Sequence, residues 1–154
     1  MSPKTWGTPT WYFFHILAAN IQEISFPLIG QDLIKQIIYI CHNLPCPDCA
    51  MHATKFWKQV KIINIKTKND LIDVLFVFHN IVNKRKNYPL FNKANLTIYE
   101  NKNIIHAYNN FKRHFHTNNN MALINDSFRR NMMLQKLNTW LISNNKHFMK
   151  PSTL

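Results

Sequence analysis

Two cysteines separated by two residues are the clearest candidates for chemistry in this chain. Cys46 and Cys49 stand in the segment LPCPDCAMH, shortly after a third cysteine, Cys41. Within one helical turn, two sulfurs at this spacing are close enough to form a disulfide. A cysteine at a helix N-terminus also has its thiolate stabilised by free backbone N–H groups. Pro47 suits such a helix start. The pair could therefore exchange electrons with other thiols, hold a metal ion or only pack.

A zinc site is the main chemical alternative to a redox pair. The three cysteines together with His42 or His52 could supply four ligands. Structural zinc sites usually join two short ligand pairs across a longer loop, whereas these residues crowd into one segment. Cys41 also falls on an apolar helical stripe, so we expect it to be buried and inert. We therefore expect no metal, and a zinc-binding helical module remains the alternative.

Composition sets limits on the class of protein. A chain of 154 residues can form one domain with its own hydrophobic core. The net charge of +12 would suit nucleic acid, but Lys and Arg are spread without a dense block. We expect no nucleic-acid function, with a basic nucleic-acid-binding adaptor as an alternative. No signal segment and no apolar run of about 20 residues is present, so we expect a soluble cytosolic protein without membrane contact.

Helical periodicity dominates the chain, which has only two glycines and few alternating apolar and polar segments. We expect helices that begin near Thr8, span about residues 31–43, begin at Cys46 and run from Thr67 to about Lys86. The last of these opens with a capping box, Thr67 and Asp70. Further helical periodicity covers residues 104–115, a linker covers residues 116–120, and an amphipathic helix covers residues 126–144. The sequence thus predicts an all-α protein.

Polar side chains lie in or beside the apolar stripes of two of these helices. His15 falls on the stripe of the first helix, one turn after Trp11. In the fourth helix, His79, Asn80 and Asn83 lie beside the stripe and precede a basic run, Lys84, Arg85 and Lys86. Imidazole and carboxamide groups can bind a flat heteroaromatic ring or a ribose, and basic groups can bind phosphates. The fourth helix therefore resembles the wall of a nucleotide-cofactor site, the alternative being an ordinary solvated face.

Three motifs occur in a recognisable order: WxxxH in the first helix, CxxCxxH at the start of the third and HNxVN in the fourth. Over about residues 6–91 the chain resembles the Erv/ALR family of FAD-dependent sulfhydryl oxidases. In its WG start, its LPCxxC context and its NKR continuation it is most similar to the short viral members. The resemblance implies a four-helix bundle with a short fifth helix, here with a helical C-terminal extension. We expect an oxidase domain over residues 1–115 and the extension over residues 116–154.

The resemblance also implies which residues contact FAD. The matching positions are Thr10, Trp11, His15, Cys49, His52, His79, Asn80, Val82 and Asn83. Where the family often has a lysine after this motif the chain has Tyr88, so Lys84, Arg85 or Lys86 would meet the diphosphate. Tyr99 would replace the tryptophan that many members place beside the adenine.

The family mechanism, carried over, makes Cys46 and Cys49 the catalytic pair. A substrate thiolate would attack the disulfide at Cys46 and release Cys49 beside the flavin. Two electrons would pass to FAD and then to O2, giving hydrogen peroxide. The chain has no second CxxC, so we expect electrons to come directly from a thiol-containing protein, such as a small thioredoxin-like partner. The resemblance further implies a homodimer, which family members generally form through their first two helices although viral members can pair differently, and we expect a viral protein of the infected cell's cytoplasm or of the virion.

Overall fold

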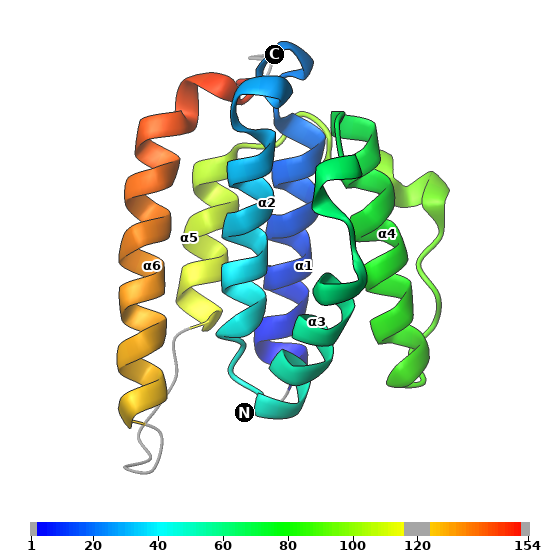
Figure 1. Cartoon of the computed structure of the whole chain (residues 1–154), viewed down its shortest axis with the longest axis vertical. Coiled ribbons are helices and arrows are strands. Elements are labelled where there is room, and N and C mark those ends of the chain that lie inside the picture. The colour runs from blue at the N-terminus through cyan, green and yellow to red at the C-terminus, as the bar shows by residue number, and fades with distance from the viewer. Residues whose placement is uncertain (1–2, 116–123, 152–154) are drawn as a thin grey trace.

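The computed structural model describes residues 3–115 and 124–151 of the chain and is all-α over these residues (Figure 1). The helices are α1 (Pro3–Asn20), α2 (Phe26–His42), α3 (Pro47–Gln59), α4 (Lys68–Arg85), α5 (Ile104–Phe115) and α6 (Ile124–Asn144). Short 3-10 helices occupy Glu23–Ser25, Ile62–Asn64, Lys93–Tyr99 and Asn145–His147. The predicted all-α fold, a four-helix bundle with a short fifth helix and a helical extension, is confirmed.

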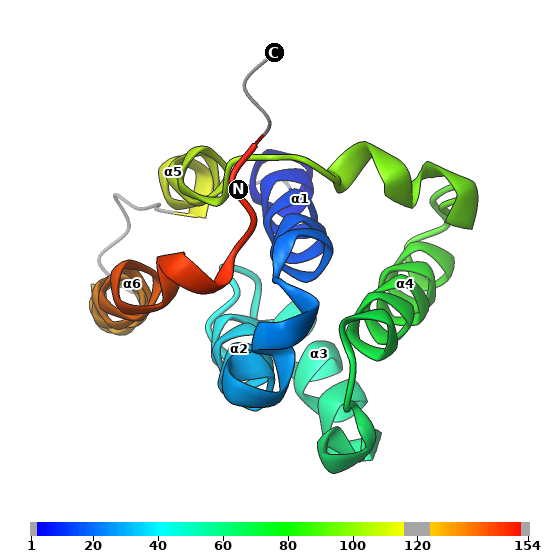
Figure 2. The same cartoon turned by 90° about the horizontal axis from the view of Figure 1, so that it is seen from above.

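The helices form a bundle in which α1 and α2 lie at the centre. Seen end-on in Figure 2, α3 and α4 lie on one side of this central pair, and α5 and α6 lie on the other. The packing follows the same plan, since α1 contacts α4 and α5 while α2 contacts α3 and α6. A single cluster of buried apolar side chains runs through all six helices. The extension helix α6 therefore shares the core of the bundle.

Two helix starts that position the site follow the predicted capping residues. Cys46 is the N-cap of α3, with Pro47 in the first turn. At α4 the Thr67 hydroxyl accepts from the backbone N–H of Asp70 at 3.1 Å, and the Asp70 carboxylate accepts from the N–H of Thr67 at 2.9 Å. This reciprocal pair is the capping box, and it fixes where the helix begins.

Two predicted helix starts were wrong. Helix α1 begins at Pro3 rather than near Thr8, so Pro9 lies inside it. An internal proline removes one helical hydrogen bond, but Trp6 in the turn before it is buried with 5% of its surface exposed, and this burial stabilises that turn. Helix α2 begins at Phe26 instead of residue 31, again with a proline in its first turn. The predicted linker over residues 116–120 lies outside the described residues.

No helix within the described part of the chain combines the length and the apolarity needed to cross a membrane.

Candidate functional site

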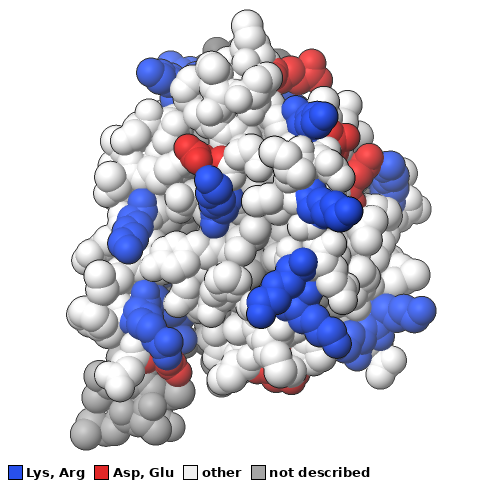
Figure 3. Space-filling view, viewed as in Figure 1, with Lys and Arg blue, Asp and Glu red and all other residues white. Residues whose placement is uncertain are grey.

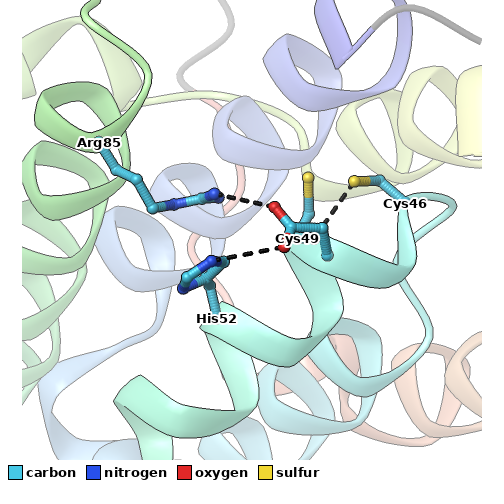
Figure 4. Close-up of polar contacts among 5 residues, drawn as sticks. Cys46, Cys49, His52 and Arg85 are labelled. Atoms are coloured by element: carbon cyan, nitrogen blue, oxygen red, sulfur yellow. Dashed lines mark hydrogen bonds and ion pairs between the residues drawn. The ribbon is translucent and has the colours of Figure 1, made fainter.

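The two cysteines of the CxxC motif face different surroundings. Cys46 is partly exposed at the start of α3, whereas Cys49, one turn later, is 6% exposed. The backbone N–H of Cys49 donates to the sulfur of Cys46 at 3.2 Å (Figure 4). The arrangement gives one sulfur that an external thiol can reach and one that faces the interior.

Charged side chains surround this pair. Burial raises the pKa of the Cys49 thiol, and the neighbouring Cys46 raises it further, while Lys86 and Arg85 act in the opposite direction. Arg85 also donates to the Asp48 carboxylate at 3.1 Å, and His52 approaches the other oxygen of that carboxylate at 3.5 Å (Figure 4). The end of α4 and its C-cap thus bring two positive charges to the start of α3, and these oppose part of the rise in the pKa of Cys49.

The buried sulfur of Cys49 lines a mainly apolar cavity of about 150 Å³. Helices α1 and α4 form most of its wall, with the end of α2 and the start of α3 closing it. The lining residues are Trp6, Gly7, Thr8, Thr10, Trp11, Phe14, Cys41, Leu44, Cys49, Ala53, Phe78, His79, Val82, Asn83, Arg85, Lys86 and Tyr88. An apolar pocket with a few polar groups at its edge is the usual form of a cofactor or ligand site.

A buried histidine, His15, and a half-buried one, His79, lie at one side of this cavity. The Nε2 atom of His15 lies 2.9 Å from Nδ1 of His79, and the His79 ring stacks on Trp11 with centroids 4.1 Å apart. Burial, together with the nearby His79, lowers the pKa of His15 to about 3, and burial lowers the pKa of His79 to about 4. Both rings are therefore neutral at pH 7, and one donates its N–H to the lone pair of the other.

A second cavity, of about 770 Å³, lies on the far side of the histidine pair. His15 lines it, and the His15 ring stacks on Tyr99 with centroids 4.7 Å apart. Apolar side chains of Ile72 and Leu96 complete part of the wall. The stacked rings thus separate two spaces, one beside Cys49 and one beside Tyr99.

Most residues predicted to contact FAD line one of the two cavities. The first is lined by Thr10, Trp11, Cys49, His79, Val82, Asn83, Arg85 and Lys86, and the second by His15 and Tyr99. The hydroxyl of Thr10 is already bonded within its own helix, to the carbonyl oxygen of Trp6 at 2.7 Å.

Three predicted residues lie outside both linings. Asn80 donates to the carbonyl oxygen of Phe91 and accepts from its N–H, at 3.1 and 2.7 Å, so its amide fixes the segment that follows α4. His52 approaches Asp48, and Lys84 is exposed. Direct contact of these three with a cofactor stays a prediction.

The structure also adds residues that the sequence analysis did not assign to the site. Cys41 is buried, as its stripe predicted, but it lines the same cavity as Cys49, and burial raises its pKa to about 12. Trp6 was missed because the start of α1 was placed too late. Phe91 stacks near His79 with centroids 5.4 Å apart, and its only sequence signal was an aromatic residue shortly after a proline.

The described residues contain no group of three or more His, Cys, Asp or Glu side chains placed to hold a metal ion.

A comparison with known protein families identifies the family of this chain. The model of the Erv1/Alr family matches residues 8–103, which include both cavities' α1 and α4 walls and the cysteine pair. The chain belongs to the Erv1/Alr family. No solved structure matches it.

Curated relatives are similar over the same region. A protein of Invertebrate iridescent virus 6, named FAD-linked sulfhydryl oxidase 347L, is 29% identical over 96 residues, or 58% of this chain and 86% of the relative. The mitochondrial FAD-linked sulfhydryl oxidase erv1 of Schizosaccharomyces pombe is 30% identical over 88 residues, covering 56% and 48% of the two chains. A fowlpox virus protein, named FAD-linked sulfhydryl oxidase FPV093, is 27% identical over 84 residues, covering 54% and 80%.

Proposed function

We propose that this chain is an FAD-linked sulfhydryl oxidase that converts pairs of protein thiols to disulfides. The observation that carries the proposal is the placement of the cysteine pair, with Cys46 accessible from outside and Cys49 buried against an aromatic-walled cavity. Membership of the Erv1/Alr family supports it, as do the names of the viral and fungal relatives.

The residues around the two cavities fit FAD. The cavity beside Cys49 has flat aromatic and apolar walls, from Trp11 and Val82, and a carboxamide, Asn83, that suits the polar edge of an isoalloxazine ring. Arg85 and Lys86 line its edge with positive charge, as a diphosphate requires. The cavity beyond the histidine pair offers Tyr99 as an aromatic face for the adenine end. The chemistry that bound FAD supplies is acceptance of two electrons from a dithiol and their delivery to O2, which becomes hydrogen peroxide.

The chain's own residues perform the thiol chemistry. A substrate thiolate attacks the sulfur of Cys46 in the oxidised pair, so a mixed disulfide forms and the Cys46–Cys49 bond breaks. Cys49 leaves as a thiolate, which Lys86 and Arg85 stabilise. A second substrate thiolate then attacks the mixed disulfide, releasing the product disulfide and Cys46 as a thiolate. The electron pair taken from the substrate now resides on the reduced cysteine pair.

The partners follow from this cycle. The substrate is a protein with two thiols, and we propose a thioredoxin-like protein as the immediate donor and the cytoplasm of an infected cell as the setting. We also propose a homodimer.

The test is the visible spectrum of the purified protein, recorded before and after addition of a dithiol under air, with peroxide measured in parallel. We expect a yellow protein with one flavin per chain that bleaches on reduction and produces peroxide. Cys46→Ser and Cys49→Ser should each lower turnover by more than about a hundredfold while flavin stays bound. A colourless protein that takes up no added FAD would refute the proposal, and metal analysis would then test the zinc alternative.

A further inference from the structure

A groove borders the cysteine motif on the side away from the flavin cavity. It encloses about 350 Å³ between the start of α3 and the start of α6. We call it the α6 groove and define it by Pro45, Pro47 and Met51 on one wall and by Asp126, Arg129 and Arg130 on the other. Helix α6 lies outside residues 8–103, the part of the chain that matches the family. One wall of this groove is therefore a feature of the extension.

The α6 groove is lined by the residues on either side of the cysteine that a substrate has to reach. Cys46 stands between Pro45 and Pro47 in the chain, and both prolines line the groove. A disulfide requires the two sulfurs to come within about 2.05 Å of each other. Residues that flank a substrate cysteine must therefore cover the surface beside Cys46 during the reaction. The groove is the hollow part of that surface.

The two walls differ in chemistry. Met51 is 58% exposed, so one wall offers an apolar side chain without cover. The other wall carries Arg129, Asp126 and Arg130, of which Asp126 forms an ion pair with Arg129 and Arg130 is only 5% exposed, so this wall has an excess of one positive charge. Lys and Arg side chains also outnumber Asp and Glu side chains on the face shown in Figure 3, in keeping with the net charge of +12. A partner segment that combines negative and apolar side chains is complementary to this groove.

We propose that the α6 groove binds the segment flanking the reactive cysteine of a protein substrate, and that this segment carries an acidic side chain beside an apolar one. The inference rests on the proposed thiol oxidase function and adds the class of substrate. Helix α6 selects among protein thiols, whereas the cysteine pair reacts with any thiol that reaches it.

The experiment measures kcat/KM of the flavin-loaded protein for three two-cysteine peptides and for dithiothreitol. The peptides differ only in the residues that flank the cysteines, which are acidic, neutral or basic. The wild-type protein should prefer the acidic over the basic peptide by about tenfold or more at low salt, and added salt should reduce this preference. Dithiothreitol has no residues flanking its thiols and no charge, so it reports on the cysteine pair alone.

Arg129→Glu is the test variant. It should lower kcat/KM for the acidic peptide by about tenfold and leave the oxidation of dithiothreitol unchanged. Arg129→Gln, which keeps most of the stem, should give an intermediate loss. Lys146→Glu is the matched control, because Lys146 is exposed beyond the far end of α6 and the change in charge is identical. It should preserve the preference.

A wild-type protein without preference among the three peptides would overturn the inference, as would an unchanged preference in both Arg129 variants. An equal loss for all peptides and dithiothreitol would also overturn it, since Arg129 would then have a structural role. Failure of the wild-type protein to oxidise dithiothreitol is a separate outcome, which refutes the oxidase proposal itself.

Discussion

His15 and His79 share one hydrogen bond, in which one neutral ring donates an N–H and the other accepts it. The His15 ring is 2% exposed, so a positive charge there would lack solvation. The pair separates the cavity beside Cys49 from the cavity beside Tyr99. Two uncharged rings therefore form part of the boundary between the two cavities.

The lowered pKa values of His15 and His79 in the folded protein should make it less stable in mild acid than at neutral pH. The folded pKa values, about 3 for His15 and about 4 for His79, lie below the value of about 6.5 in an unfolded chain. The unfolded chain therefore binds protons first, and stability present above pH 6.5 is lost as the pH falls toward 4. For His15 the loss at pH 5 should be about 2 kcal/mol. Urea unfolding at pH 7 and pH 5 measures it.

His15→Gln provides the control for this pH dependence, because it removes one of the two buried imidazoles. Its stability should fall less between pH 7 and pH 5 than that of the wild type. His42→Gln alters an exposed histidine at the end of α2 and should keep the wild-type dependence. Equal pH dependence in the wild type and both variants would show that the pair does not titrate as described.

Substitution of Cys41 tests whether every cysteine sulfur at the cavity takes part in the redox chemistry. It is fully buried, and its raised pKa keeps it a thiol at neutral pH, so it is a poor nucleophile. Cys41→Ser should retain oxidase activity within about twofold and lose about 1–3 kcal/mol of stability, because a hydroxyl replaces a thiol in the core. Activity and urea unfolding, measured beside Cys41→Ala, check this. Loss of turnover with flavin still bound would make Cys41 part of the redox pathway.

At the level of helices, the start of α4 matters because this helix carries His79, Asn83 and Arg85 to the site. Thr67→Ala removes the hydroxyl that accepts from the N–H of Asp70 and should cost about 1 kcal/mol of stability. Thr139→Ala is the matched control, since Thr139 is exposed in the middle of α6 and alanine favours a helix. Urea unfolding compares them, and an equal effect would argue against the cap.

The sequence predicted best those features that depend on neighbouring residues. Apolar periodicity located the main helices, and the capping residues Cys46 and Thr67 located two starts. The HNxVN motif predicted part of the wall of the cavity beside Cys49, because its residues His79 and Asn83 lie one turn apart on α4. The bonds of Asn80 and the place of Arg129 in the α6 groove could not be predicted, since each depends on a segment distant in the sequence. Asn80 meets Phe91 through a loop, and Arg129 meets the α3 start only after α6 packs on α2.

For the molecule as a whole, helix α6 is part of one continuous core. Its buried side chains, Met133, Leu134, Leu137 and Leu141, belong to the same apolar cluster as those of α2. At about 2 kcal/mol for each buried side chain they contribute an amount comparable to the whole stability of a small domain. The predicted division at residues 115 and 116 therefore falls within this packing.

A chain shortened to residues 1–115 tests that division. We expect it to lose cooperative unfolding, because the face of α2 that α6 covers becomes exposed to water. Circular dichroism during urea titration measures this. A shortened chain that unfolds cooperatively and keeps its flavin would establish residues 1–115 as an independent domain.

Point substitutions test the packing of α6 while the helix itself stays in the chain. Leu137 is 1% exposed and Ile142 is 68% exposed on the same helix. Leu137→Ala should cost about 3 kcal/mol, and Ile142→Ala should change stability by less than about 0.5 kcal/mol. Similar values for both, measured by urea unfolding, would contradict the assigned burial.

The far end of the extension is tied to the end of α1. The backbone of Met149 donates to the carbonyl oxygen of Asn20 at 2.7 Å, and that of Gln22 donates to His147 at 2.9 Å. These contacts join residues nearly a whole chain length apart, so they raise the contact order of the fold. During translation, α1 is made early but cannot be secured until residue 149 has been added. The face of α2 that α6 covers has no partner until residues 124–144 have been made, so we expect a nascent chain to expose this apolar surface to chaperones until late in synthesis.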